Sequence, residues 1–279
     1  MSLLWKLGIV SGLVLIVFGG GTFATYELFV KKASKTAGNR NEAVVGPTPD
    51  PGIALLEQGK QLIAKGEVED GKRLLISLFQ SFPKSAKADE ARKTVGDMNI
   101  QDLFSSRPSA DKKEYVVARG DSIAKIAAKT KAAPELIFKA NGLDGLMIQP
   151  GQKFIIPSGQ FTLQIFMEAQ AVELLNHGQF FRWYKGLDVH LPPNMKPGQL
   201  KVIGKEAWSG GARVSFGEKK FLGSSRWVVL SQSGVTLYSE TAPNTPNVTK
   251  PRFGIELAPE DMEELFALLP KETTVTVSK

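Results

Sequence analysis

The sequence contains no cysteine, and its 279 residues include only two histidines, His177 and His190. The lack of cysteine excludes disulfides, thiolate zinc sites, iron–sulfur clusters and a cysteine nucleophile. Two histidines are too few for a histidine-rich metal site or for a relay of several imidazoles. We therefore expect no metal and no cofactor, although a mechanism based on two carboxylates stays compatible with the composition.

Charge of one sign is only in modest excess, with 35 Lys and Arg against 28 Asp and Glu, a net charge of +7. Segment 112–158 alone holds 8 basic and 4 acidic residues, more than half of that excess. A nucleic-acid-binding stripe could use such a segment, but a solvated basic face is its commoner meaning. We therefore expect no nucleic-acid partner.

One long apolar run is present, over residues 7–26, which carry no formal charge. Twenty helical residues span about 30 Å, the thickness of the hydrocarbon layer of a bilayer. Trp5 and Tyr26 flank the run, as expected of rings at a membrane interface. Few soluble helices are apolar on every face at this length, so we predict a membrane-inserting segment over 1–32. Whether it stays as an anchor or is cleaved as a signal is left open.

Residues 33–52 are polar and rich in Gly, Pro, Asn and Thr, which predicts a linker. Segment 53–111 instead has apolar residues at helical spacing, with breaks at Gly66 and Pro83 and an expected N-cap at Ser85. It resembles a tetratricopeptide (TPR) unit at Gly59, Leu62, Gly71, Leu75, Leu78 and Pro83. Only about one and a half repeats are present, so a plain helical hairpin acting as a spacer is the alternative.

Segment 112–158 has the pattern of a small β-α-α-β module. A strand at Tyr115, Val116 and Val117 precedes a turn, and Asp121 or Ser122 is placed to cap the following helix. Pro134 opens a second helix, Asn141-Gly142 ends it, and Phe154, Ile155 and Ile156 form the second strand. The segment resembles the LysM family at Tyr115, Gly120, Asp121, Ser122, Ile123, Ile126, Ala127, Asn141, Gly142, Gln149, Gly151, Gln152, Ile156 and Pro157.

The LysM resemblance implies binding of N-acetylglucosamine-containing glycan, chiefly peptidoglycan. The family's shallow groove lies between two loops, and carrying it over implicates Gly120, Asp121, Ser122, Ile123, Met147, Ile148, Gln149 and Pro150. Backbone amides and carbonyls can pair with the N-acetyl group, while Ile123, Met147 and Ile148 would cover its methyl. For each of these side chains, a role in the core or in a turn is the alternative.

Segment 159–279 reads as mostly β with one late helix. Strands are expected around 161–166, 172–175, 180–183, 200–203, 227–230, 235–237 and 273–277, with a hairpin turn at Asn176-His177-Gly178. A helix is expected to open at Pro259-Glu260-Asp261. With the preceding parts, the expected fold class is multidomain α+β.

The order and spacing in 159–279 resemble the L,D-transpeptidase (YkuD-type) catalytic domain. The stretches that carry the resemblance are 171–186, 196–202, 221–227, 254–265 and 269–277. The family's catalysis uses a cysteine nucleophile, a histidine base and an arginine, in Ser-His-Gly-Cys-x-Arg and His-Gly-Thr motifs. At the matching positions this sequence has Tyr238, Ser239, Arg252, Gly254 and Glu256, so no catalytic residue is expected.

These resemblances predict a membrane-anchored cell-envelope protein that binds peptidoglycan and whose L,D-transpeptidase-like domain is a pseudoenzyme. That domain would serve as scaffold or peptide-binding surface. The alternatives are an active enzyme of the family with unusual residues, or an activating partner of such an enzyme. The positive-inside rule favours a cytoplasmic location for the long part, because the apolar run is followed by Lys31, Lys32, Lys35 and Arg40. A wall-binding module argues instead for the periplasm or cell-wall space.

Overall fold

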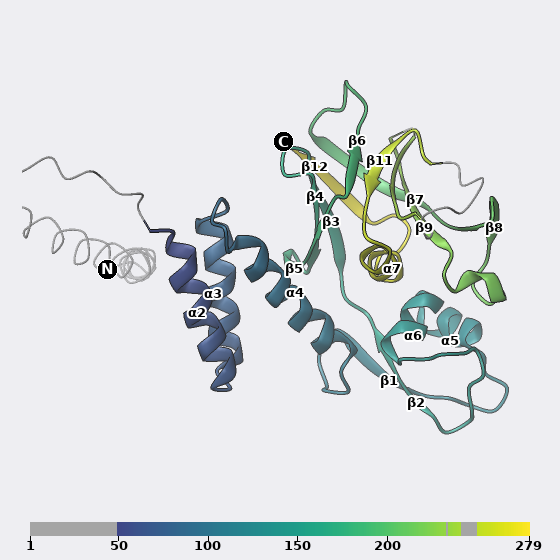
Figure 1. Cartoon of the computed structure of the whole chain (residues 1–279). Coiled ribbons are helices and arrows are strands. Elements are labelled where there is room, and N and C mark those ends of the chain that lie inside the picture. Colours follow the sequence, from purple (N-terminus) through teal and green to yellow (C-terminus); the bar gives the residue numbers. More distant parts are fainter. Residues whose placement is uncertain (1–48, 233, 241–249) are drawn as a thin grey trace, which may run out of the picture. The chain divides into compact units, whose positions relative to one another are not determined.

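The computed structural model describes residues 49–232, 234–240 and 250–279. The expected membrane segment, 1–32, and nearly all of the expected linker lie outside the described residues. Residues 50–279 form one compact unit (Figure 1). Within the described part, no helix combines the length and the apolar character needed to cross a bilayer.

Three helices open the described unit: α2 (Pro51–Ala64), α3 (Val68–Ser81) and α4 (Ala88–Phe104). Helix α2 therefore begins slightly before the expected boundary at residue 53. The close packing expected at small residues is confirmed, since a Cβ on Gly59 would lie 2.5 Å from a Leu75 methyl carbon. Leu56, Leu75, Leu78, Phe79, Ala88, Ala91 and Val95 form the core of this helical segment.

The expected N-cap at Ser85 is wrong, because α4 begins at Ala88 and Lys87 occupies its cap position. Asp50 instead caps α2, accepting from the Gly52 amide, and its other carboxylate oxygen accepts from the Ser85 hydroxyl at 2.9 Å. Ser85 thus links the turn before α4 to the start of α2 and does not cap its own helix.

The next elements are β1 (Lys112–Val116), α5 (Ile123–Thr130), α6 (Pro134–Ala140) and β2 (Lys153–Pro157). Strands β1 and β2 pair antiparallel in a two-stranded sheet of their own. Ser122 is the N-cap of α5, accepting from the Lys125 amide, which settles the choice between Asp121 and Ser122. The expected β-α-α-β module is confirmed.

The remaining chain is built on a ten-stranded sheet, with α7 (Pro259–Leu268) packed on it. Its strands are β3 (Phe161–Phe166), β4 (Ala171–Asn176), β5 (Gln179–Lys185), β6 (Asp188–His190), β7 (Gly198–Ser209), β8 (Ala212–Val214), β9 (Ser225–Leu230), β10 (Val235–Tyr238), β11 (Phe253–Glu256) and β12 (Thr274–Ser278). The order is β5-β4-β3-β12-β7-β9-β10-β11-β6, with β8 paired to β7. Every expected strand is present; β6, β8 and β11 were not expected as strands.

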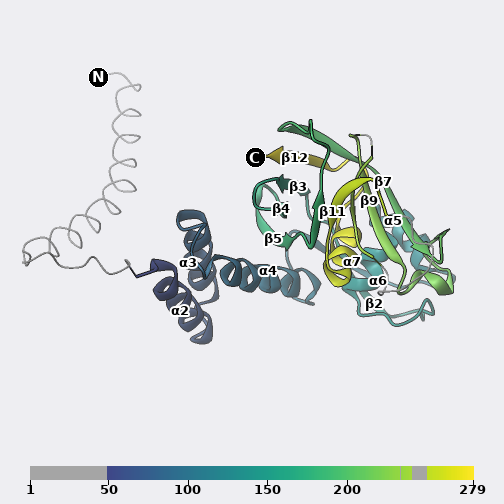
Figure 2. The ribbon, with the colours of Figure 1, turned by 45° about the horizontal axis from the view of Figure 1, so that its top comes forward.

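The helical segment packs directly on the edge strand β5, where α4 lies beside the sheet (Figures 1 and 2). Phe180 from β5 enters the helical core, with its ring 4.7 Å from that of Phe79. The Asn99 amide donates to the Phe181 carbonyl at 2.9 Å, which satisfies a backbone acceptor of this edge strand. The α4 end of the segment is therefore part of the folded unit, not a free spacer.

The LysM-like module is joined to the β-rich domain by shared apolar packing. Leu136 of α6 belongs to the same buried cluster as Leu265 and Phe266 of α7. Phe216 packs against both that cluster and the module's own core, and its ring meets Phe138 edge-on at 6.0 Å. The two parts therefore share a continuous apolar core.

Candidate functional site

The two loops expected to bind glycan are adjacent at one end of the β1–β2 pair. The Val117 amide donates to the Gln152 carbonyl, and the Gly151 amide donates to the Val117 carbonyl, at 2.9 and 2.8 Å. These bonds extend the ladder past Val116 and bring the loop after β1 beside the loop before β2. Residues 120–122 and 147–150, far apart in sequence, thus lie at the same end of the module.

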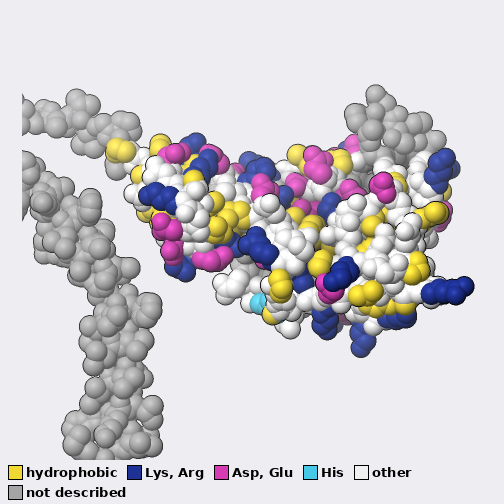
Figure 3. Space-filling view, turned by 90° about the horizontal axis from the view of Figure 1, so that it is seen from below, with side chains coloured by type: hydrophobic (Ala, Val, Ile, Leu, Met, Phe, Trp, Pro, Cys, Tyr) yellow, Lys and Arg dark blue, Asp and Glu magenta, His cyan; other side chains and the backbone are white. Residues whose placement is uncertain are grey.

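Several residues of these loops are accessible to a ligand. Met147 is 95% exposed, and Gly120, Ser122, Gln149 and Pro150 are also exposed. Figure 3, seen from below relative to Figure 1, shows lysine and arginine side chains among apolar patches. Shallow, partly apolar surfaces with free backbone groups suit an acetamido sugar.

Two of the expected glycan residues have side chains committed to the module itself. Ile123 is only 2% exposed and packs in the core with Ile126 and Ile137. Its side chain is therefore not available to cover a sugar methyl in this conformation. Ile148 is half-buried against the same core, so Met147 is the most exposed of the three side chains expected to cover the sugar methyl.

Asp121 also has a side chain committed to the module. Its carboxylate is 4% exposed and holds the loop together. It accepts from the Tyr115 hydroxyl at 2.8 Å, the Ala118 amide at 2.9 Å and the Lys129 ammonium at 2.7 Å. The bond from Lys129, followed by those from Ala118 and Tyr115, lowers the pKa of Asp121 to about 2. Asp121 thus fixes the shape of the loop that presents Gly120 and Ser122.

The positions that match the catalytic motifs also come together, on the neighbouring parallel strands β10 and β11. Tyr238 lies opposite Glu256 in register, and its hydroxyl lies 3.4 Å from a Glu256 carboxylate oxygen. Burial, and then the nearby Glu256 charge, raises the pKa of Tyr238 to about 12. Ser239 is buried, and its hydroxyl lies 3.4 Å from the Arg226 amide.

Gly254 has no room for a side chain. A Cβ built there would lie 2.1 Å from the Thr236 carbonyl oxygen, far inside any normal contact, and 3.2 Å from the Tyr238 ring. The obstacle at 2.1 Å is backbone of the adjacent strand, which cannot rotate away as a side chain can. Glycine is the residue that this close strand approach accepts.

By sequence, His190 is expected in a loop, because two prolines follow it at 192–193, and the structure corrects this. It is the last residue of β6, in register with Gly254 of β11, and its ring stacks on Phe253 at 5.7 Å. Strand β6 has three residues and no alternating pattern, so the sequence gives no signal for this pairing. The expected turn at His177 is confirmed, with φ +50° there and +74° at Gly178.

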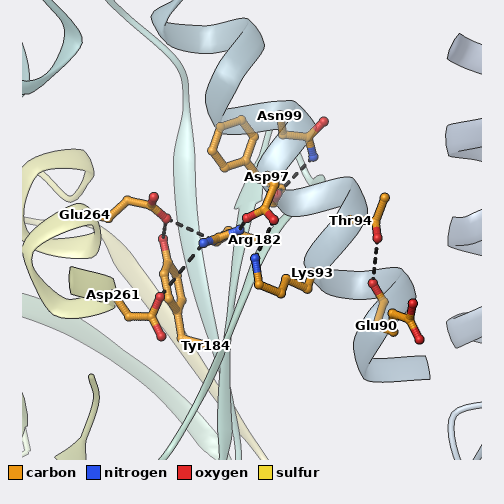
Figure 4. A network of polar contacts seen from close by, with 10 residues as sticks. Glu90, Lys93, Thr94, Asp97, Asn99, Arg182, Tyr184, Asp261 and Glu264 are labelled. Atoms are coloured by element: carbon orange, nitrogen blue, oxygen red, sulfur yellow. Dashed lines mark hydrogen bonds and ion pairs between the residues drawn. The ribbon is translucent and has the colours of Figure 1, made fainter. Parts of the chain in front are cut away.

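A polar network that the sequence did not indicate lies where α4, β5 and α7 meet (Figure 4). Its centre is Arg182, which pairs with Asp97 of α4 and with Glu264 of α7, the latter at 3.0 Å. The buried Tyr184 hydroxyl donates to Glu264 at 3.0 Å. Burial raises the pKa of Glu264, and the Arg182 charge opposes that rise.

The described residues contain no cluster of three or more His, Asp or Glu side chains suited to a metal ion. At the expected glycan loops, the exposed groups offer hydrogen bonding and apolar contact. Around Gly254, Tyr238 and Glu256 form a hydrogen-bonded pair, and the neighbouring strand β10 lies too close to Gly254 for a side chain there.

Comparison with known proteins matches residues 115–157 to the LysM domain. No curated protein matches the sequence significantly. Solved structures similar to this chain include an L,D-transpeptidase from Mycobacterium smegmatis, with 12% identity, a TM-score of 0.31, and coverage of 46% of this chain and 64% of that one. An L,D-transpeptidase (Yku) from Stackebrandtia nassauensis has 20% identity, a TM-score of 0.31, and coverage of 44% and 56%.

An L,D-transpeptidase from Mycobacterium tuberculosis H37Rv has 12% identity and a TM-score of 0.31, covering 48% of this chain and 75% of that one. The aligned part of this chain spans less than two thirds of the first two structures. The chain thus contains a LysM domain at residues 115–157, and its structure bears a partial similarity to L,D-transpeptidases.

Proposed function

We propose that this chain is a cell-envelope protein that binds N-acetylglucosamine-containing glycan, chiefly peptidoglycan, through the two LysM loops. The observation that carries the proposal is the LysM match together with two adjacent loops that leave Met147, Gln149 and Pro150 exposed. Asp121 and Ser122 hold the first loop from within, so a sugar would meet a preformed surface at little entropic cost.

The test is sedimentation of residues 50–279 with insoluble peptidoglycan, with chitin oligomers as competitor. Met147→Ser should weaken binding about fivefold, because a methionine contact with the N-acetyl methyl is worth about 1 kcal/mol. The matched control is Leu187→Ser, which truncates another exposed apolar side chain outside the module. No sedimentation of folded protein at micromolar concentration would refute glycan binding; equal losses in both variants would refute the placement at Met147.

The second part of the proposal is that the β-rich domain performs no acyl transfer and serves as scaffold or peptide-binding surface. Support comes from the sequence resemblance to L,D-transpeptidases, in which Gly254 and Glu256 replace the nucleophile and the cation. Acyl transfer needs a nucleophile beside a base. The Thr236 carbonyl lies so close to Gly254 that a nucleophilic side chain has no room at this position. A negative charge at Glu256 would also repel a substrate carboxylate.

Mass spectrometry after incubation with a carbapenem and with a tetrapeptide donor tests this second part. We expect the unmodified mass in both cases. A stoichiometric acyl adduct on any residue would favour the alternative, an active member of the family. Co-purification with an L,D-transpeptidase whose activity rises in its presence would favour the remaining alternative, an activating partner.

We also propose that residues 1–32 anchor the chain in the cytoplasmic membrane and that the rest lies in the periplasm or cell-wall space. The support is the apolar run at 7–26 and a glycan-binding module whose ligand lies outside the cytoplasm. Reporters fused after Lys279 that work only inside or only outside the membrane distinguish the two orientations. Activity of the cytoplasmic reporter alone would overturn this topology.

A further inference from the structure

A cavity of about 480 Å³ lies between the LysM domain and the β-rich domain, and neither proposed site uses it. Helix α6 contributes Glu135 to its wall, β7 contributes Lys205, and α7 contributes Phe266. Phe216 and Phe221, from the chain between β8 and β9, complete the apolar part of the wall. A cavity of this size accommodates a small ligand or the end of a larger one.

Lys205 is the unusual residue of this cavity. Its side chain is partly buried, and within the described part of the chain no carboxylate lies within 4 Å of its ammonium group. The ammonium lies 4.4 Å from the centroid of the Phe266 ring, a contact with a ring face and not with an anion. Burial, to which Arg226 and Lys271 add repulsion, lowers the pKa of Lys205 to about 8, while Glu135 acts in the opposite sense.

The acidic groups around the cavity do not neutralise this lysine. Glu206 is already engaged, accepting from Arg213 at 2.6 Å and from the Trp208 indole at 3.2 Å. Glu135 influences Lys205 only at long range and makes no ion pair among the described residues. A second buried cation, Arg226, lies over the rings of Phe221 and Phe266, and its guanidinium donates to the Ser224 and Phe221 carbonyls at 2.7 and 2.9 Å, so the protein itself holds it.

The charge of Lys205 is poorly neutralised in the empty protein, and Arg226 beside the same Phe266 ring adds to the positive potential there. An ammonium removed from water without a counter-ion loses solvation energy that ring contacts replace only in part. An anion that enters the cavity would restore the balance and would form a charge-assisted hydrogen bond with Lys205. The charge arrangement therefore selects an anionic ligand over a neutral one.

The cavity adjoins the second glycan loop. Its wall residue Phe216 precedes Gly217, where a Cβ would lie 3.9 Å from the Leu146 side chain. Leu146 is followed directly by Met147, the exposed apolar residue of the glycan surface. The chain at Leu146, next to Met147, thus lies against the chain at Gly217, next to the cavity wall. Peptidoglycan carries short peptides with free carboxylates along its sugar chain.

We propose that the cavity at Lys205 binds a carboxylate carried by the same wall polymer whose sugars occupy the LysM loops. This inference rests on the proposed glycan binding and adds a second, charge-selective subsite between the two domains. Lys205 supplies the charge, and Phe216, Phe221 and Phe266 supply the apolar part of the wall beside it.

The experiment compares four ligands on residues 50–279: chitin oligomers, sacculi that still carry phosphate polymers, sacculi freed of those polymers (the untreated sacculi), and untreated sacculi whose carboxylates have been converted to methylamides. We expect amidation to weaken binding about tenfold, the value of one charge-assisted hydrogen bond. Lys205→Gln should reduce binding to untreated sacculi by the same factor and leave chitin binding unchanged. Glu135→Gln should tighten binding to untreated sacculi, because it removes a competing negative charge.

The control is Lys201→Gln, on the same strand, where the ammonium is exposed and pairs with Glu272 at 3.2 Å. It should retain the difference between untreated and amidated sacculi. A Lys205→Gln protein that also retains this difference would overturn the subsite. So would preference only for sacculi that still carry phosphate polymers, since the ligand would then be a phosphate. Loss of chitin binding in the unmodified protein would instead refute the proposed function itself.

Discussion

At Gly254 the backbone of the neighbouring strand leaves no room for a side chain. A Cβ at this position would meet the Thr236 carbonyl at 2.1 Å. We predict that Gly254→Ala lowers the free energy of unfolding by about 3 kcal/mol, because β10 and β11 must move apart. Chemical denaturation measures this, with Gly198→Ala as control, where a Cβ meets nothing within 4 Å. Equal stability of the two variants would contradict the close approach.

The same measurement bears on attempts to restore a nucleophile. Gly254→Cys would bring the thiol carbon into the same contact, so the variant should unfold at lower denaturant concentration than Gly198→Cys. We expect no acyl adduct on it, since position 252 offers an arginine and not a base. The pseudoenzyme proposal therefore does not depend on a single replaced residue.

The low pKa of Asp121 predicts how the stability of the protein depends on pH. Its pKa is about 2, below the ordinary value of 3.8, so its stabilising effect is complete above about pH 4. That effect is lost as the pH falls through about 2, because the carboxylate then becomes protonated in the folded state as well. Asp121→Asn should accordingly lower the melting temperature at pH 6, and the gap from the unmodified protein should close toward pH 2. A gap independent of pH would show that the carboxylate charge is not involved.

At the scale of the element, the docking of α4 on β5 depends on Arg182. Its guanidinium is largely buried between Asp97 and Glu264, so Arg182→Met leaves the mostly buried Glu264 without its cation, while Asp97 keeps its pair with Lys93. We predict a loss of about 3 kcal/mol, the usual cost of breaking a buried ion pair from one side. Urea unfolding is the measurement. Arg73→Met, which removes an exposed pair with Asp70, should change stability by less than about 0.5 kcal/mol.

Local patterns explain why some elements could be predicted and others could not. The LysM helices follow from the Ser122 cap, Pro134 and Asn141-Gly142, all of which act within a few residues of the element they define. Strands β6, β8 and β11 have three or four residues and depend on their neighbours for pairing. His190 was misplaced for that reason. The Arg182 network joins residues about 80 positions apart, which no local pattern reveals.

In the proposed glycan site, too, local sequence could predict some features and packing alone determined the others. Family resemblance placed both loops, and the structure brings them together, but the sequence could not separate Met147 from Ile123. Both are apolar, and only the packing of α5 determines that one is 95% exposed and the other 2%. The Lys205 cavity lay entirely beyond sequence reasoning, because α6, β7, β8, α7 and the chain between β8 and β9 all contribute to it.

At the scale of the whole molecule, the shared core couples the LysM domain to the β-rich domain. Leu136 lies in the domain carrying the glycan loops but is buried with residues of α7. We predict one calorimetric transition for residues 50–279, and Leu136→Ala should lower its midpoint as a single peak, costing about 2–3 kcal/mol. Two separated peaks in either protein would contradict a shared core.

The last strand of the chain, β12, lies in the interior of the sheet, parallel to β3 and antiparallel to β7. Neither half of the sheet can join the other until residues 274–278 have been synthesised. The ribosome adds about 5–20 residues per second, so the growing chain has seconds in which its β-rich part is incomplete. During translation the protein therefore carries two unpaired sheet edges, at β3 and β7, and the arrival of β12 determines when those edges are closed.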